Sequence, residues 1–225
     1  MPVLRILAGG AAQPLVEKAR PGFTIDGTFS AVGAMRDRLL AGEPADIVIL
    51  SRALVDELAR SGHVVASSIT DVARVATAVA VRRGDPLPAI GDKADLAAAL
   101  GAADEIHFPD PALATAGIHF AKVMRDLGVW DELRERLRPA PNGATAMAAL
   151  AASKSARPIG CTQATEILST PGIMVAAPLP PGCALATTYT CAITGHAAAA
   201  AEAASLIDLL TSDTDRNARR QLGFS

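Results

Sequence analysis

Short apolar runs alternate with amphipathic stretches along the first part of the chain. The apolar runs predict strands at 3–8, 22–28 and 46–50, and the stretches of helical spacing predict helices at 13–19, 32–40 and 52–61. Strands that alternate with helices in this way are typical of a parallel sheet covered by helices. The pattern therefore predicts an α/β unit here.

A longer β-rich segment at 73–81 leads into a second series of elements. Further strands are expected at 105–108, 158–161, 173–176 and 187–193, and helices at 95–100, 115–127, 131–137, 145–153, 164–168, 197–210 and 213–221. The returning strand at 187–193 precedes helices but no further unit. We therefore expect two lobes, with lobe 1 formed by 1–75 and 190–225 and lobe 2 by 76–189.

Composition excludes several classes of protein. Hydrophobic residues make up 50% of the 225 positions and the net charge is -2, so a large core is expected and no basic surface for nucleic acid. No apolar run is long enough to cross a membrane. The three cysteines, Cys161, Cys183 and Cys191, lack the spacing of a disulfide framework or a zinc site. We expect no metal, no cofactor and no membrane or nucleic-acid partner.

The N-terminus predicts a cytoplasmic protein. Met1-Pro2 leads directly into the first expected strand, which leaves no room for the basic region, apolar stretch and cleavage site of a secretory signal. An odd number of cysteines fits a reducing compartment. The alternative is a periplasmic location, if the sequence lacks its signal peptide.

Several separated segments resemble the periplasmic molybdate-binding proteins, and in order they cover essentially the whole chain. They are FSAVGAM at 29–35, LAGEPADIVI at 40–49, DPALATAGI at 110–118, LGVWD at 127–131 and RQLGF at 220–224. The resemblance implies a two-lobed α/β fold of the type II periplasmic-binding-protein kind. It also implies a hinge and an interlobe cleft that closes on a small anion.

The resemblance further implies which positions contact the ligand. Helix N-termini carry unpaired N–H groups and a partial positive charge, so two of them bind an anion without lysine or arginine. The implied contacts are Gly9, Gly10, Ala11, Gln13, Ser30, Val32, Gly33, Thr115, Ala116, Gly117, Asn142, Gly143, Thr162 and Gln163. The alternatives are a plain strand-to-helix turn at 9–13 and helix N-caps at Ser30 and Asn142.

The hydroxyl donors of the molybdate binders are missing from the matched positions. The two loop serines of that family match Ala11 and Val32, and its second-lobe tyrosine matches Thr162 approximately. Each lost donor leaves an oxyanion oxygen unpaired in a closed site, at roughly 1–3 kcal/mol. The pattern therefore argues against molybdate, although a shifted alignment would place Ser30 or Gln13 in these roles.

A second set of segments resembles the branch of this superfamily that includes aconitate isomerase. It comprises VAVRRG at 79–84, GIHFAKV at 117–123, IGCTQ at 159–163 and APLP at 177–180. This resemblance implies a di- or tricarboxylate ligand and a proton-shift isomerisation. The candidate proton-transfer residues are His119, His107 and Glu166, each with a packed or surface side chain as the alternative. The alternative function is binding of molybdate, tungstate or another small oxyanion for ABC transport or sensing.

Overall fold

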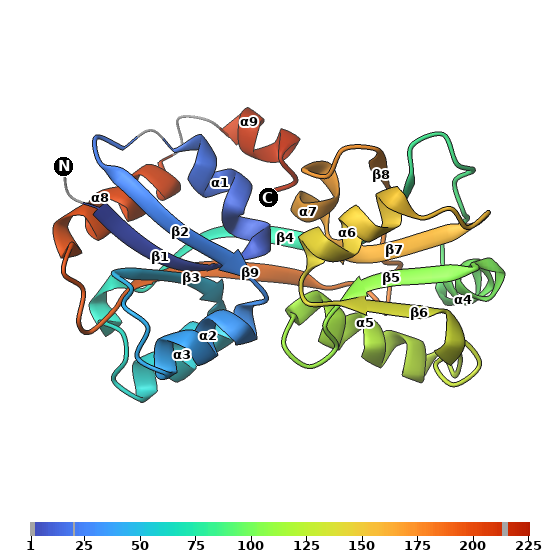
Figure 1. Cartoon of the computed structure of the whole chain (residues 1–225), viewed down its shortest axis with the longest axis horizontal. Helices are drawn as coiled ribbons and strands as arrows, with labels where there is room; N and C mark the ends of the chain where they lie inside the picture. The colour runs from blue at the N-terminus through green and yellow to red at the C-terminus, as the bar shows by residue number, and fades with distance from the viewer. Residues whose placement is uncertain (1–2, 20, 213–215) are drawn as a thin grey trace. The chain divides into compact units, whose positions relative to one another are not determined.

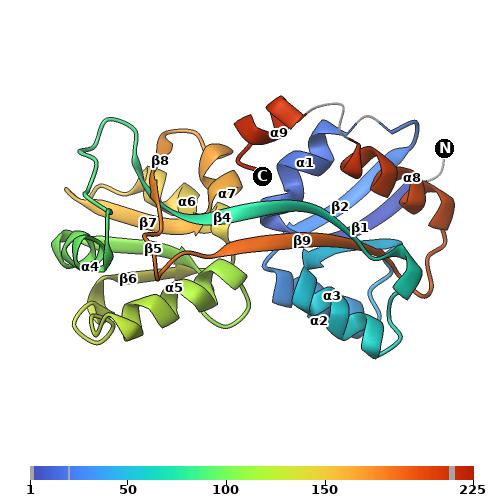
Figure 2. The same cartoon turned by 180° about the vertical axis from the view of Figure 1, so that it is seen from behind.

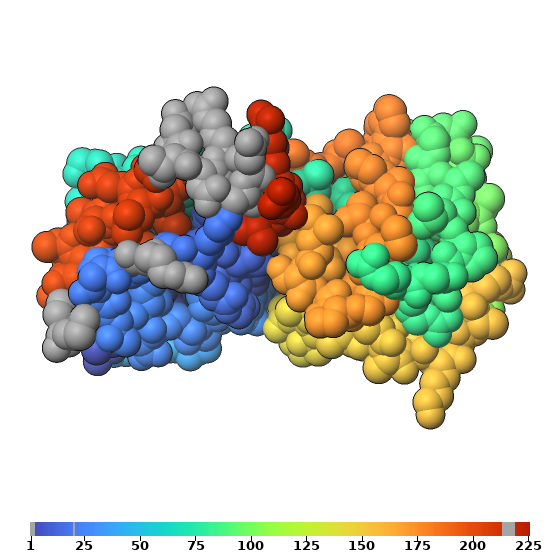
Figure 3. Space-filling model, turned by 90° about the horizontal axis from the view of Figure 1, so that it is seen from above, coloured from blue at the N-terminus to red at the C-terminus, as the bar shows by residue number. Residues whose placement is uncertain are grey.

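The computed structural model describes residues 3–19, 21–212 and 216–225 (Figure 1). The chain divides into two compact units: residues 1–75 with 187–225 form unit 1, and residues 76–186 form unit 2. In the space-filling view the blue N-terminal and red C-terminal parts of unit 1 lie side by side (Figure 3). Unit 1 is therefore assembled from both ends of the chain.

Unit 1 is built on a mostly parallel sheet in the order β2-β1-β3-β9. Its strands are β1 (Val3–Gly9), β2 (Thr24–Ser30), β3 (Ile47–Ser51) and β9 (Ala186–Ile193). The first three run parallel, as predicted, and β9 runs antiparallel to β3. Gly9 pairs with Ser30, so β1 and β2 end at the same edge of the sheet.

Helices cover both faces of this sheet (Figures 1 and 2). They are α1 (Gln13–Lys18), α2 (Val32–Leu40), α3 (Arg52–Arg60), α8 (Ala200–Thr211) and α9 (Arg216–Gln221), with 3-10 turns at Gly10–Ala12 and Ala66–Ser68. α2 and α3 lie on one face, and α1 and α8 on the other. The first four residues of β3 are fully buried, because a strand covered on both faces needs apolar side chains throughout.

Unit 2 has a mixed sheet in the order β6-β5-β7-β4, with β8 paired to the other edge of β4. The strands are β4 (Thr70–Arg82), which begins in unit 1, β5 (Glu105–Pro109), β6 (Leu137–Ala140), β7 (Pro158–Gln163) and β8 (Ile173–Pro178). β5 is parallel to β6 and β7, whereas β4 is antiparallel to β7 and β8.

Side chains alternate between the two faces of this sheet and form two cores. The helices are α4 (Lys93–Ala102), α5 (Thr115–Asp126), α6 (Gly143–Ala152) and α7 (Ala164–Leu168). Val79 and Phe108 belong to the core beneath α4 and α5, where the rings of Phe108 and Phe120 meet edge to face at 5.8 Å. Ala78 and Met147 belong to the core beneath α6 and α7.

The helix predicted at 131–137 is wrong. This segment contains turns, a 3-10 turn at Arg134–Arg136 and then the strand β6. Pro139 disfavours helix in the residue before it, and it is tolerated in β6 because this strand lies at the edge of the sheet.

The other differences concern the ends of elements. β2 begins at Thr24 instead of 22, β4 extends beyond 73–81 at both ends, and α8 begins at Ala200 instead of 197. The helix expected at 213–221 is present as α9, and positions 213–215 lie outside the described residues. Among the described helices, none has the length and apolar character needed to cross a membrane.

Candidate functional site

Each unit has an edge where its parallel strands end. Ligands of open α/β sheets bind outside the carboxyl ends of the strands. The ligand contacts implied by the sequence lie at these edges: Gly9, Gly10, Ala11, Gln13, Ser30, Val32 and Gly33 in unit 1, and Thr115, Ala116, Gly117, Asn142, Gly143, Thr162 and Gln163 in unit 2.

Gly9 lets an aromatic ring lie against the end of β1. A Cβ atom at this position would lie 2.7 Å from Cε1 of Tyr189 and 2.7 Å from Cγ1 of Val32. Tyr189 is almost completely buried and pairs with Ser51 across β3 and β9. Only glycine therefore leaves room for the tyrosine ring at this edge.

The N-cap residues of α1 and α2 at this edge, Ala12 and Ala31, form no side-chain cap hydrogen bonds. α2 has Ala31 as its N-cap, with no side-chain hydrogen bond from that residue, so the alternative of Ser30 as N-cap is wrong. Gln13 donates to Glu17 within its own helix, at 2.7 Å. Ala11, Val32 and Gly33 are buried. Unit 1 thus offers backbone amides and small side chains.

Gly117 has a packing role at the start of α5. A Cβ atom there would lie 2.2 Å from the carbonyl oxygen of Asp110 and 2.3 Å from that of Pro109. Oδ1 of Asp110 accepts the backbone N–H groups of Ala112 (2.7 Å) and Leu113 (3.0 Å), which folds the loop into the helix. The first turn of α5 is therefore pressed against the carboxyl end of β5.

A carboxyl group lies at the corner where β7 enters α7. The hydroxyl of Thr162 donates to Oε2 of Glu166 at 2.6 Å, and the backbone N–H of Gln163 donates to the same carboxyl group. Gln163 is the N-cap of α7 and Glu166 its third residue, which is the spacing of a capping box. A Cβ atom on Gly143 would lie 1.9 Å from Oε2 of Glu166. We call these four residues the Glu166 corner.

Among the residues that the structure describes, no cation compensates the charge of the Glu166 corner. Glu166 is only 8% exposed. Burial raises the pKa of Glu166 to about 7, while the hydrogen bonds from Thr162 and from the backbone of Gln163 act in the opposite direction. The elements α6, α7, β7 and β8 contain no lysine, arginine or histidine. The carboxyl group therefore changes its charge near neutral pH.

Asn142 closes the start of α6, as the N-cap alternative predicts. Its side chain accepts the backbone N–H of Thr145 at 2.8 Å. α6 then begins at Gly143, directly beside the carboxyl group of Glu166. The start of α6 and the Glu166 corner thus form one local structure.

His107 lies away from the Glu166 corner. Its Nε2 atom is 3.1 Å from Oε2 of Glu105, which also accepts the hydroxyl of Ser153 at 2.6 Å. Ser153 follows the last turn of α6, whereas Glu166 lies beside the first turn. Burial lowers the pKa of His107, and the hydrogen bond to Glu105 partly offsets this effect.

His119 also binds elsewhere. Its Nε2 atom donates to the carbonyl oxygen of Cys183 at 2.7 Å. It belongs to α5, which packs on the sheet face opposite to α6 (Figure 1). The three candidate proton-transfer residues therefore have different partners, and among them Glu166 is the one that accepts a hydrogen bond from the side chain of a predicted ligand contact, Thr162.

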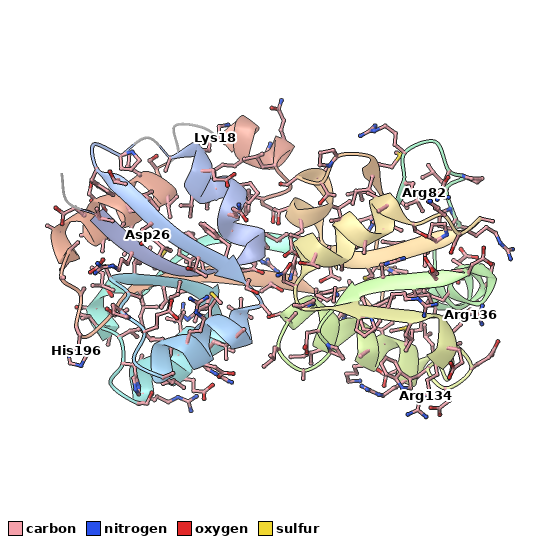
Figure 4. All side chains as sticks on the ribbon, viewed as in Figure 1. Lys18, Asp26, Arg82, Arg134, Arg136 and His196 are labelled. Atoms are coloured by element: carbon pink, nitrogen blue, oxygen red, sulfur yellow. The ribbon has the colours of Figure 1, made fainter. Side chains whose placement is uncertain are left out.

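Arg82 and Arg136 of unit 2 bind groups other than Glu166. Arg82 ends β4 beside the amino end of β7 and binds Asp85 at 2.7 Å. Arg136 donates to the carbonyl oxygens of Gly101 and Ala103. Figure 4 labels both side chains among the sticks of unit 2. Neither forms an ion pair with Glu166 within the described part of the chain.

The family model for bacterial extracellular solute-binding proteins matches residues 9–225. The chain belongs to this family. Solved structures agree with the type II periplasmic-binding-protein fold. The periplasmic molybdate-binding protein of Azotobacter vinelandii superposes with a TM-score of 0.82 at 16% identity, covering 99% of this chain and 98% of that one. The sulfate-binding protein SubI of Mycobacterium tuberculosis has a TM-score of 0.75 at 16% identity, covering 100% and 86%. The resemblance predicted from sequence is confirmed at the level of fold.

One protein of similar sequence is described as an enzyme and not as a solute-binding protein. An aconitate isomerase from a Pseudomonas species is 27% identical over 183 residues, which is 80% of this chain. The matched region spans 66% of that protein's length.

Two features of the corner escaped sequence reasoning. The contact between Gly143 and Glu166 joins residues that are far apart in the chain, and no spacing rule signals it. The return hydrogen bond from the backbone of Gln163 to Glu166 has the N-cap to N3 spacing of a capping box, which could have placed the carboxyl group at the start of α7. Among the described residues, no group of three or more histidine, cysteine, aspartate or glutamate side chains could hold a metal ion.

Proposed function

We propose that this solute-binding protein binds a small di- or tricarboxylate and shifts a proton along it, with Glu166 as the group that exchanges the proton. The observation that carries the proposal is the buried carboxyl of Glu166, which has no cationic partner in the described part of the chain and a pKa of about 7. A perturbed acid at the carboxyl edge of a sheet is a candidate functional group on physical grounds.

The carboxyl edge of each unit offers groups that suit a carboxylate ligand. The first turns of α2 and α5 lack side-chain caps from their N-cap residues, so their amides can donate to carboxylate oxygens. A neutral Glu166 can add a further hydrogen bond, as a protonated acid does in other buried sites. Ala11 and Val32 supply no hydroxyl groups for a tetrahedral oxyanion. These features together favour a carboxylate over molybdate.

The proposed reaction is balanced without any cofactor. A proton leaves the carbon next to the double bond, the double bond moves by one position, and a proton is added two carbons away. An acid whose pKa lies near the working pH is suited to both transfers. Amides at helix N-termini would stabilise the negative charge that develops on the ligand carboxylate. The sequence similarity to an aconitate isomerase supports this choice of reaction.

The alternative is a binding protein for molybdate, tungstate or another oxyanion. It is favoured by the first turns of α2 and α5, whose N-cap residues form no side-chain cap, and by fold similarity to proteins described as molybdate- and sulfate-binding. It requires no proton transfer, so Glu166 would serve only as the cap of α7. The cytoplasmic location stays a prediction, which fractionation of cells that produce the native protein would test.

Thermal unfolding with a panel of anions separates the two functions. The panel contains molybdate, tungstate, sulfate, citrate, cis- and trans-aconitate and tricarballylate. A ligand at 100 times its Kd stabilises the folded state by about 2.7 kcal/mol, which raises the melting temperature. We expect a shift with an unsaturated tricarboxylate and none with molybdate. A shift with molybdate or tungstate alone would contradict the proposal and support the oxyanion binder.

A further inference from the structure

The hydroxyl of Thr162 donates its hydrogen bond to Glu166. Its side chain is fully buried, and the 2.6 Å distance from its Oγ1 to Oε2 of Glu166 is typical of a hydroxyl that donates to an ionised carboxylate. A hydroxyl donates only one hydrogen. When it is bound to Glu166 it cannot also donate to a ligand.

Gly143 leaves the space that the carboxyl group of Glu166 occupies. A Cβ atom there would lie 2.3 Å from Cδ of Glu166 and 2.4 Å from Oγ1 of Thr162. Any other residue at this position would push the carboxyl group away from the first turn of α6. The carboxyl group thus lies between the hydroxyl of Thr162 and the backbone of Gly143, where a residue with a side chain would leave no space for it.

We propose that Thr162 is a positioning residue, which holds the Glu166 carboxyl against Gly143 and sets the pH at which it ionises, without contact to the ligand. The resemblance to molybdate binders instead implies that the residue at this place binds the ligand directly. That Thr162 does not contact the ligand rests on the proposed function, whereas its effect on Glu166 is a property of the ligand-free protein.

The neighbouring elements contain few groups that could interfere with this titration. Cys161 is the only other titratable residue in α6, α7, β7 and β8, and it faces the core beneath α4 and α5. On β5, Glu105 and His107 bind each other near the last turn of α6, and Arg138 of β6 lies 3.7 Å from Glu105. Thr162 is therefore the side chain whose removal should act on Glu166 most directly.

The direction of the effect follows from the charge of the acceptor. A hydrogen bond donated to the ionised form stabilises that form, so its loss raises the pKa of Glu166. The loss of a hydrogen bond to a charged group corresponds to a shift of roughly one to two pH units. Thr162→Val should therefore move the titration of Glu166 upward by about one unit or more.

The test is a titration of Glu166 in the ligand-free protein, followed by the carboxyl carbon signal in NMR and assigned by its loss in Glu166→Gln. Thr162→Val and Thr162→Ala should both raise the midpoint, so the result does not depend on the folding of one variant. Thr162→Ser keeps the hydroxyl and should restore the midpoint. Thr165→Val is the matched control, because the Thr165 hydroxyl is buried without a hydrogen-bond partner.

An unchanged midpoint in Thr162→Val would overturn the proposal, as would an equal shift in Thr165→Val. A second arm measures the affinity for trans-aconitate in the Glu166→Gln background. We expect Thr162→Val to leave this affinity unchanged there, and a loss of tenfold or more would mean that Thr162 contacts the ligand. If no carboxylate binds, the proposed function fails, while the titration still decides the role of Thr162.

Discussion

At the carboxyl edge of each unit, a glycine leaves space for a side chain, but the side chains differ in chemistry. In unit 1, Gly9 leaves room for the ring of Tyr189, and in unit 2, Gly143 leaves room for the carboxyl group of Glu166. Both partners come from distant parts of the sequence and both are buried. The unit 1 edge thus contains an aromatic ring, and the unit 2 edge contains an acid whose pKa lies near neutral pH.

The unit 1 edge can recognise a ligand by its shape, whereas the Glu166 corner can also take part in its chemistry. Besides Tyr189, the unit 1 edge offers amides, small apolar side chains and the polar side chains of Gln13 and Ser30, which can select a ligand by size and hydrogen bonding. The Glu166 corner can in addition hold or release a proton. A solute-binding protein needs only the first property, whereas an isomerase needs both.

The largest predicted effect on stability is the pH dependence that Glu166 causes. Its pKa is about 7 in the folded protein and 4.5 in an unperturbed glutamate. The folded state therefore retains a proton that the unfolded chain releases between these values, so its stability falls as pH rises through this window. Between pH 5 and pH 8 the wild type should lose roughly 2–3 kcal/mol relative to Glu166→Gln, which keeps the cap of α7.

Urea unfolding at both pH values measures this difference. Trp130 is the only tryptophan of the chain and packs against the core of unit 2, so its fluorescence reports on this unit. Glu135→Gln is the control, since Glu135 is exposed. Parallel pH profiles for the wild type and Glu166→Gln would mean that Glu166 ionises normally.

Gly143→Ala should disrupt the Glu166 corner. The added Cβ atom would stand 1.9 Å from Oε2 of Glu166, so the carboxyl group must move. We expect a loss of roughly 2 kcal/mol, as for other overpacked sites. Gly101→Ala in α4 is the matched control, because a Cβ atom there meets nothing within 4 Å. That variant should be neutral or up to about 1 kcal/mol more stable.

Gly9→Ala should have a smaller effect in unit 1. The added Cβ atom would lie 2.7 Å from the edge of the Tyr189 ring and from a methyl group of Val32, and both side chains can shift. We expect a loss of about 1 kcal/mol, measured by hydrogen exchange of the amides in β1 and β2. Gly22→Ala meets nothing within 4 Å and should change little. A larger loss in Gly9→Ala than in Gly143→Ala would reverse the comparison of the two edges.

The fold could be predicted from sequence because its signals are local. Buried runs such as 46–50 and helices that stop near a glycine specify the order of the elements, and the order specifies the fold class. The short edge strand β6 was missed, since Arg134 to Arg138 also fits a solvated helix and only pairing with β5 makes it a strand.

The candidate site could be predicted only in part. The sequence nominated Thr162, Gly143 and Glu166 separately, as ligand contacts and a proton-transfer residue. It could not show that they touch, because the contact depends on how α6 and α7 pack on β7. It also gave His107 and His119 equal rank with Glu166, since their partners Glu105 and Cys183 are visible only in the structure.

Solvent deuterium incorporation tests the central claim most directly. The wild type is incubated with trans-aconitate in deuterated buffer at pH 7, and the carbon-bound positions are followed by NMR. The account predicts incorporation by the wild type and by Glu135→Gln, and a rate at least about 100-fold lower in Glu166→Gln, as expected for the loss of a general acid–base group. Equal rates in Glu166→Gln, or no incorporation by the wild type into any carboxylate that it binds, would contradict it.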